Sequence, residues 1–191
     1  MDQLYSGPMN ARSLVRLLIP LALLATLSGC ASLSESECRN ANWEDVGIRD
    51  GAAGRPEEYL IEHSKACGKV AVVPDRGAYL HGREQGLERF CVPYRVYQIG
   101  EYGGGFDAGI CRNFDQDRLI SAYEQGREVN RLGGELGSID GEISKINEQL
   151  KRDDLKKDER NALAFRLGQL VYQRTEVEHA YEDARSRARN L

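Results

Sequence analysis

The second half of the sequence is constrained by two series of apolar positions whose spacing alternates between three and four residues. The alternation places each series on one face of a helix and is typical of coiled coils. We therefore predict two long helices within residues 115–191 and a mainly α protein. The first series is Val129, Leu132, Leu136, Ile139, Ile143, Ile146 and Leu150, and the second is Leu163, Leu167, Leu170, Arg174, Val177, Tyr181, Ala184 and Ala188.

The two helices are predicted to form an antiparallel coiled-coil hairpin. The charged segment "KRDDLKKDER" between them is typical of a turn, near residues 152–159. If Leu150 lies opposite Leu163, the two series face each other without a slip in register, and Arg174 lies in the seam opposite Ile139. A lone charged seam residue is expected to fix the register, with its guanidinium reaching an acidic residue at the edge. An arm of about 35 residues would be about 50 Å long.

Residues 37–114 are predicted to form a small, glycine-rich domain clipped by disulfides. In "NWEDVGIRDGAAG", the glycines predict turns rather than a regular element. Pro56 suits the first turn of a short helix that runs to about Cys67. Asp75 can cap a second helix, and "VPYRVYQIGEYGGGFDAGIC" alternates in a way that predicts an irregular hairpin. The second helix has an apolar stripe of Tyr79, Gly82, Gly86, Leu87 and Phe90.

Four cysteines in this domain, Cys38, Cys67, Cys91 and Cys111, allow three disulfide connectivities. We favour Cys38 with Cys67 and Cys91 with Cys111, because each bridge then closes a loop with its own glycine-rich segment. A zinc site formed by His63 with Cys67, Cys91 and Cys111 is the alternative. Because the sequence has no C-x-x-C pair, we favour disulfides and expect no metal and no cofactor.

The N-terminus has the pattern of an export signal. Arg12 and Arg16 precede an apolar run from residue 17 to residue 24, which is too short to span a bilayer. Residues 27–30, "LSGC", then resemble the lipobox of bacterial lipoproteins. This resemblance implies a signal peptide over 1–29 that starts at Met1 or Met9. It also implies acyl chains such as palmitate on Cys30, followed by a tether over 30–36.

The lipobox resemblance also implies an address in the cell envelope. Ala31 and Ser32 follow Cys30, so the Asp that favours inner-membrane retention is absent, and we expect the outer membrane, facing the periplasm. The alternative is a plain secretory signal with a chance cysteine at position 30. Cleavage before Cys30 would change the formal charge from -4 to -5. A mildly acidic product without a basic patch is not expected to bind nucleic acid.

A short repeat links the two parts of the chain. Residues 79–84, "YLHGRE", are echoed by residues 123–128, "YEQGRE". One interpretation is a ligand site framed by Tyr79, Arg83, Tyr123 and Arg127. The other, which we favour, is that the two helices pack on each other through Gly82 and Gly126, because a missing side chain lets backbones approach closely. Residues 119–133 would then dock on the Tyr79 helix.

Several of these segments together resemble the bacterial lipoprotein family known as domain of unknown function 2799. The matching pieces are "NW", "GIRDGAAG", "HSKAC", "VVPDRGAYLHGREQGLERFC", the glycines before Phe106 with Cys111, and "AYEQGRE" leading into the coiled coil. The family has no established activity. The resemblance therefore implies an envelope lipoprotein and this architecture, and no reaction.

Two classes of function follow. We favour an envelope lipoprotein with a structural or interaction role, anchored in the membrane through acyl chains on Cys30. Its hairpin would reach a partner protein or the cell wall. The alternative is an envelope enzyme, for example a cell-wall hydrolase that uses carboxylates near Asp45 and Asp50. No spacing in the sequence selects a catalytic pair, so we name no catalytic residue.

Overall fold

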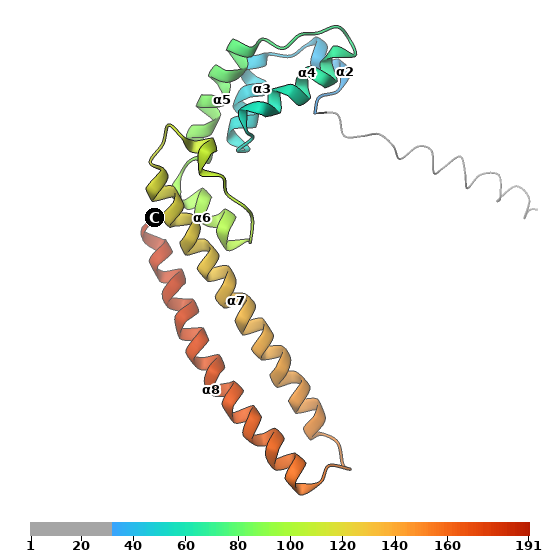
Figure 1. The fold of residues 1–191 in the computed structure, drawn as a ribbon, viewed down its shortest axis with the longest axis vertical. Coiled ribbons are helices and arrows are strands. Elements are labelled where there is room, and N and C mark those ends of the chain that lie inside the picture. The colour runs from blue at the N-terminus through green and yellow to red at the C-terminus, as the bar shows by residue number, and fades with distance from the viewer. Residues whose placement is uncertain (1–31) are drawn as a thin grey trace, which may run out of the picture. The chain divides into compact units, whose positions relative to one another are not determined.

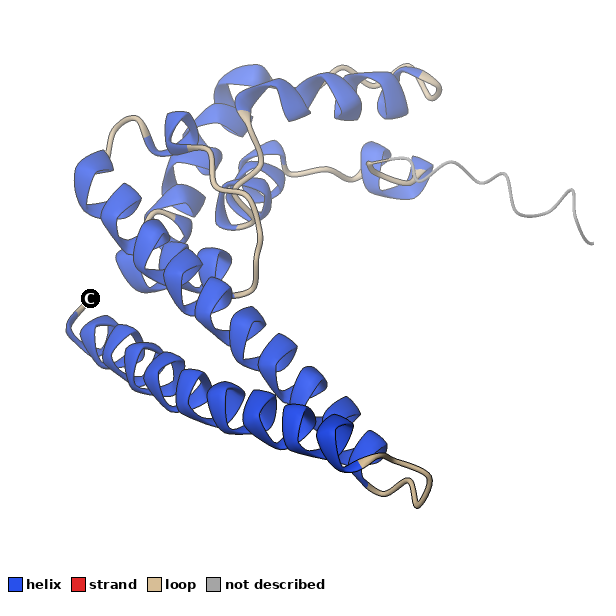
Figure 2. Cartoon of the chain, turned by 60° about the horizontal axis from the view of Figure 1, so that its bottom comes forward, coloured by secondary structure: helices blue, strands red, loops and turns tan. Residues whose placement is uncertain are grey.

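The structure is a computed structural model that describes residues 32–191, and the regular elements in that range are all helices (Figures 1 and 2). This confirms the prediction of a mainly α protein. The predicted signal peptide and Cys30 lie outside the described residues. Backbone contacts divide the chain into two units, one with residues 32–41 and 58–74, the other with residues 42–57 and 75–191.

The first unit is held together by a disulfide between two short helices. Helix α2 (Glu35–Arg39) begins inside the segment predicted as a tether, and Ser34 caps it by accepting a hydrogen bond from the Glu37 amide. Helix α4 (Leu60–Gly68) follows the 3-10 turn η2 (Glu57–Tyr59). Cys38 of α2 is bonded to Cys67 of α4, with 5.3 Å between their Cα atoms. Both cysteines are buried.

The second unit begins with two helices, α3 (Trp43–Ala52) and α5 (Arg76–Phe90), packed against each other. Asp75 caps α5 by accepting from the Ala78 amide, and the predicted stripe of α5 is buried, so both predictions are confirmed. The prediction of turns over α3 is wrong. Gly47 and Gly51 are buried on one face of a regular helix, and packing on α5 outweighs their helix cost of about 1 kcal/mol each.

The predicted irregular hairpin is also wrong, because its first half is helix α6 (Pro93–Glu101). Pro93 occupies the first turn, where its missing amide hydrogen is not needed. Val96, Tyr97 and Gly100 form the buried face, so the three- and four-residue spacing prevails over the short alternation. A 3-10 turn, η3 (Ala108–Cys111), ends the segment, capped by Asp107.

The second disulfide ties the end of α5 to η3. Cys91 is bonded to Cys111, with 5.7 Å between the Cα atoms. The two disulfides are the pairs that the sequence favours, and the sulfur atoms that a zinc site would need are bonded to each other instead. The bridge is buried in a core with apolar side chains from α5, α6 and α7, namely Leu87, Phe90, Val96 and Leu119.

Two long helices complete the unit. Helix α7 (Gln116–Leu150) and helix α8 (Lys157–Arg187) lie side by side in opposite directions, and η4 (Ala188–Asn190) ends the chain (Figure 1). Arg174 donates from Nε to Asp140 Oδ1 at 2.7 Å. No helix within residues 32–191 combines the length and the apolar character that a membrane crossing requires. The apolar side chains between α7 and α8 include Ile139, Ile143, Ile146, Leu163, Leu167 and Leu170.

Candidate functional site

The repeated Tyr-x-x-Gly-Arg segments lie on two helices with different partners. Gly82 of α5 packs on α3, where an added Cβ would overlap the Glu44 carbonyl. Gly126 of α7 packs on α6, where a Cβ would overlap the Tyr97 carbonyl and come within 2.8 Å of the Glu101 nitrogen. The predicted packing of Gly82 on Gly126 is therefore wrong, although Leu119 at the start of α7 shares a core with Leu87 and Phe90 of the Tyr79 helix. Each glycine meets a helix that carries glycines of its own.

In the first segment, the tyrosine and the arginine are buried and bonded to the chain itself. Tyr79 is 0% exposed, and its hydroxyl donates to Asp50 Oδ2 at 2.8 Å. Arg83 is 8% exposed, and its Nε donates to the Arg55 carbonyl at 2.9 Å. Buried polar groups need such partners. This half of the repeat is therefore a structural anchor that ties α5 to α3 and to the segment that follows α3.

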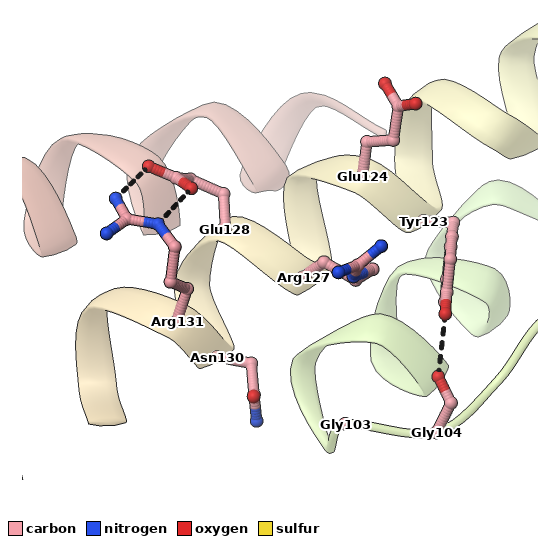
Figure 3. A pocket seen from close by; sticks show the side chains of 8 residues that line it. All are labelled: Gly103, Gly104, Tyr123, Glu124, Arg127, Glu128, Asn130 and Arg131. Atoms are coloured by element: carbon pink, nitrogen blue, oxygen red, sulfur yellow. Dashed lines mark hydrogen bonds and ion pairs between the residues drawn. The ribbon is translucent and has the colours of Figure 1, made fainter. Parts of the chain in front are cut away.

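In the second segment, the equivalent side chains border open space (Figure 3). The Tyr123 hydroxyl donates to the Gly104 carbonyl at 3.0 Å. Arg127 is exposed, and its guanidinium carbon lies 6.0 Å from the centre of the Tyr123 ring. Over residues 32–191, the Arg127 side chain makes no hydrogen bond or ion pair. The two arginines of the repeat thus have different surroundings, and the four side chains do not frame one common site.

The space beside Arg127 is a cavity of about 500 Å³. Arg131 is already occupied, since it donates to both carboxylate oxygens of Glu128 and to Glu135. The hydrogen bonds from Arg131 lower the pKa of Glu128, which keeps that carboxylate ionised. Asn130 donates to the Glu101 carbonyl at 2.9 Å. The residues that line the cavity are Gly103, Gly104, Tyr123, Glu124, Arg127, Glu128, Asn130 and Arg131.

A second exposed feature lies on α8, on the face turned away from α7. Phe165 and Tyr172 are each 70% exposed and are seven residues apart, with Gly168 between them. On a helix, this spacing places all three residues on one face. Nothing lies within 4 Å of the position where Gly168 would carry a Cβ. The two aromatic rings therefore form an accessible apolar strip, which we call the α8 strip.

The carboxylates considered for catalysis are not brought together. Asp45 and Asp50 both lie on α3, five residues apart, which corresponds to about 140° around the helix. Asp45 is exposed, whereas Asp50 accepts the Tyr79 hydrogen bond. Within residues 32–191, no cluster of three or more His, Cys, Asp or Glu side chains has the geometry to hold a metal ion.

Sequence reasoning missed the cavity beside Arg127 and the α8 strip. The cavity was missed because α6 was expected to be extended, so Gly103 and Gly104 had no predicted place beside Tyr123. The α8 strip could have been found, because Phe165 and Tyr172 fall outside the apolar series that faces α7 and are spaced by seven residues.

Part of the chain matches a known protein family that has no assigned activity. Residues 42–128 match the family model described as "Protein of unknown function (DUF2799)". Neither a curated protein nor a solved structure matches the chain at a significant level. The matched range spans α3, α4, α5, α6 and the first part of α7. It therefore includes the close contacts of both helix pairs and most of the residues that line the cavity beside Arg127, whereas Asn130 and Arg131 lie beyond it. The match places residues 42–128 in this family of proteins of unknown function.

Proposed function

We propose that the protein is a lipid-anchored, non-catalytic lipoprotein of the bacterial cell envelope that binds a partner protein through its two long helices. In this proposal, acyl chains on Cys30 hold the mature protein in the outer membrane, facing the periplasm. The small glycine-rich domain precedes the long helices, and α7 and α8 form an antiparallel coiled-coil hairpin. The partner binds the α8 strip.

The α8 strip is the observation that carries the interaction role. Two aromatic side chains that are each 70% exposed are costly to leave in water, and aromatic residues are enriched at the centres of protein interfaces. The strip is flanked on α8 by Arg166, Gln169 and Gln173, which provide polar groups for the rim of an interface. We therefore propose a protein partner with an apolar groove, bound in the helix-in-groove manner.

The disulfides support an exported protein. Cys38–Cys67 and Cys91–Cys111 use all four cysteines of the described residues, and such bridges persist in oxidising compartments such as the periplasm. The "LSGC" segment at residues 27–30 supports attachment through Cys30. With several acyl chains, membrane attachment is stable, whereas a single chain gives only marginal binding.

Site-specific photo-crosslinking in cells tests the partner. A photoreactive residue at position 165 or 172 should give a discrete adduct with another protein. The matched control is Lys145, which is exposed on α7 and lies outside the α8 strip. Equal adducts from position 145, adducts with cell-wall glycan alone, or no adduct would contradict the proposed protein partner.

The membrane anchor is tested separately. Cys30→Ser should leave the precursor uncleaved by the lipoprotein pathway and without acyl chains, which mass spectrometry of the purified protein measures. Cys38→Ser is the control. Because Cys38 is in a disulfide, its substitution should leave cleavage and acylation at Cys30 unchanged. Acylation of the Cys30→Ser protein would contradict the proposed attachment. That result would leave the crosslinking experiment unaffected.

A further inference from the structure

The two close helix pairs share a spacing that extends beyond the short repeat. Gly47 follows Cys38 by nine residues, and Gly100 follows Cys91 by nine. In the second half of each segment, Tyr79 follows Cys67 by twelve residues, and Tyr123 follows Cys111 by twelve. The first cysteine of each segment is bonded to the second, as Cys38–Cys67 and as Cys91–Cys111.

The backbone contacts repeat in the same way. A Cβ on Gly47 would overlap the Tyr79 carbonyl and lie 2.8 Å from the Arg83 nitrogen. A Cβ on Gly100 would overlap the Tyr123 carbonyl and lie 2.8 Å from the Arg127 nitrogen. These are equivalent atoms of the repeated Tyr-x-x-Gly-Arg segments. The same holds from the other helix of each pair. A Cβ on Gly82 would overlap the carbonyl of Glu44, three residues before Gly47. A Cβ on Gly126 would overlap the carbonyl of Tyr97, three residues before Gly100.

The copies differ in the segment that joins their two helices. Cys67 follows Gly47 by twenty residues, but Cys111 follows Gly100 by only eleven. In the longer copy, the segment after α3 supplies the Arg55 carbonyl that accepts the hydrogen bond from Arg83 Nε. In the shorter copy, the chain after α6 reaches Tyr123 through the Gly104 carbonyl, and Arg127 is left facing the cavity (Figure 3).

We propose that the pairs α3 with α5 and α6 with α7 are two copies of one unit, and that the second copy binds a peptide segment in the cavity beside Arg127. The Arg127 guanidinium donates to a backbone carbonyl of the bound peptide, as Arg83 donates to the Arg55 carbonyl in the first copy. The first copy thus shows, within the same molecule, the chemistry that fills such a site.

The charges of the cavity favour a neutral carbonyl over a multiply charged anion. Arg127 and Arg131 are balanced by Glu124 and Glu128, and Arg131 is bonded to Glu128. A phosphate would face two carboxylates and only one arginine without an ion pair. A peptide carbonyl carries no formal charge and still gains a charge-assisted hydrogen bond. The glycines at 103 and 104 line the opposite side with backbone, which leaves room for an extended chain.

The test uses a blocked peptide with the sequence of residues 52–57, "AAGRPE", because this segment contains the carbonyl that fills the first copy. The full chain is labelled with ¹⁵N and purified in detergent. The amide resonances of Gly103 and Gly104 and the Arg127 Nε resonance are then followed as the peptide is titrated to millimolar concentration. We expect saturable shifts of all three. Arg127→Ala should weaken the binding measured at the two glycines by about tenfold, because one charge-assisted hydrogen bond is lost.

Arg118→Ala is the matched control, since Arg118 is exposed on the same helix and lies outside the cavity. It should leave the affinity unchanged. Inorganic phosphate, titrated in a parallel experiment, should leave the three resonances unshifted. The proposal is overturned if millimolar peptide causes no shift, if Arg118→Ala and Arg127→Ala have equal effects, or if phosphate binds at Arg127 and the peptide does not. None of these results depends on the α8 strip.

Discussion

Helix α7 contains glycines of two kinds. Gly126 touches the backbone of α6, whereas Gly134, Gly137 and Gly141 have nothing within 4 Å of the position where a Cβ would lie. All four cost helix propensity, about 1 kcal/mol each relative to alanine, but only Gly126 gains a close backbone contact in return. The facing helix explains the difference, since α6 presents Gly100 at the contact.

The pair of α3 and α5 has the same kind of contact as Gly126, extended over one more turn. Gly47 and Gly51 on α3 meet Gly82 and Gly86 on α5, and a Cβ on any of them would overlap a carbonyl of the other helix. In this protein, a helical glycine marks a close contact where its partner helix also carries glycine. Where it does not, the glycine only softens the helix.

The largest effect is expected for Gly82→Leu. Its Cβ would overlap the Glu44 carbonyl, and no rotamer change can relieve a clash of Cβ with backbone. The α3–α5 pair should separate, with a loss of more than about 4 kcal/mol in the free energy of unfolding. Urea denaturation followed by circular dichroism measures this loss. Gly134→Leu is the control and should remain folded; wild-type stability of Gly82→Leu would refute the contact.

A smaller loss is expected when the second disulfide is removed. Cys91→Ser combined with Cys111→Ser should lower the free energy of unfolding by about 3 kcal/mol, because the disulfide closes a loop between cysteines that are 20 residues apart and its loss frees that loop in the unfolded chain. Amide hydrogen exchange should rise first in α6 and η3, which share a core with the bridge. Faster exchange confined to α8 would show that the bridge does not support the α6–α7 pair.

The exposed glycines of α7 should respond in the opposite direction. Gly134→Ala and Gly141→Ala should each raise the free energy of unfolding by up to about 1 kcal/mol, because alanine has the better helix propensity and the added methyl group meets no atom. Ala164→Gly, on an exposed position of α8, is the reciprocal control and should lower stability by a similar amount. Loss of stability in Gly134→Ala would reveal a contact on that face.

The smallest effect concerns Tyr97 at the α6–α7 contact. Burial, reinforced by the Glu101 carboxylate, raises the pKa of Tyr97 to about 12. Because the neutral phenol is favoured in the folded protein, its contribution to stability is complete below about pH 10 and is lost as the pH rises towards 12. Absorbance at 295 nm should show late tyrosine ionisation that is reduced in Tyr97→Phe. Titration of all tyrosines near pH 10 would contradict this burial.

Much of the helical structure could be predicted from apolar spacing. The long helices follow from stripes of large residues, and α5 follows from the Asp75 cap and from Tyr79, Leu87 and Phe90, which mark its buried face despite two glycines. Helices α3 and α6 could not be predicted in this way, because their buried faces include Gly47, Gly51 and Gly100, which read as turn residues. The sequence does not show that a glycine is packed until its partner helix is known.

The candidate site was predicted in part. The repeated Tyr, Gly and Arg positions were found, but their partners were not, since Asp50 and Arg55 carry no pattern that links them to Tyr79 and Arg83. The different lengths of the joining segments decide whether an arginine is covered by the chain itself. Such lengths become informative only when the glycine-to-cysteine spacings of the two copies are compared, twenty residues after Gly47 and eleven after Gly100.

The most direct test of the two kinds of glycine places one methyl group at each kind of position on the same helix. Stability to urea is measured for Gly126→Ala and Gly137→Ala. We expect Gly126→Ala to lower the free energy of unfolding by several kcal/mol, because its methyl overlaps the Tyr97 carbonyl, and Gly137→Ala to raise it by up to about 1 kcal/mol. Stabilisation by both substitutions would contradict the backbone contact between α6 and α7.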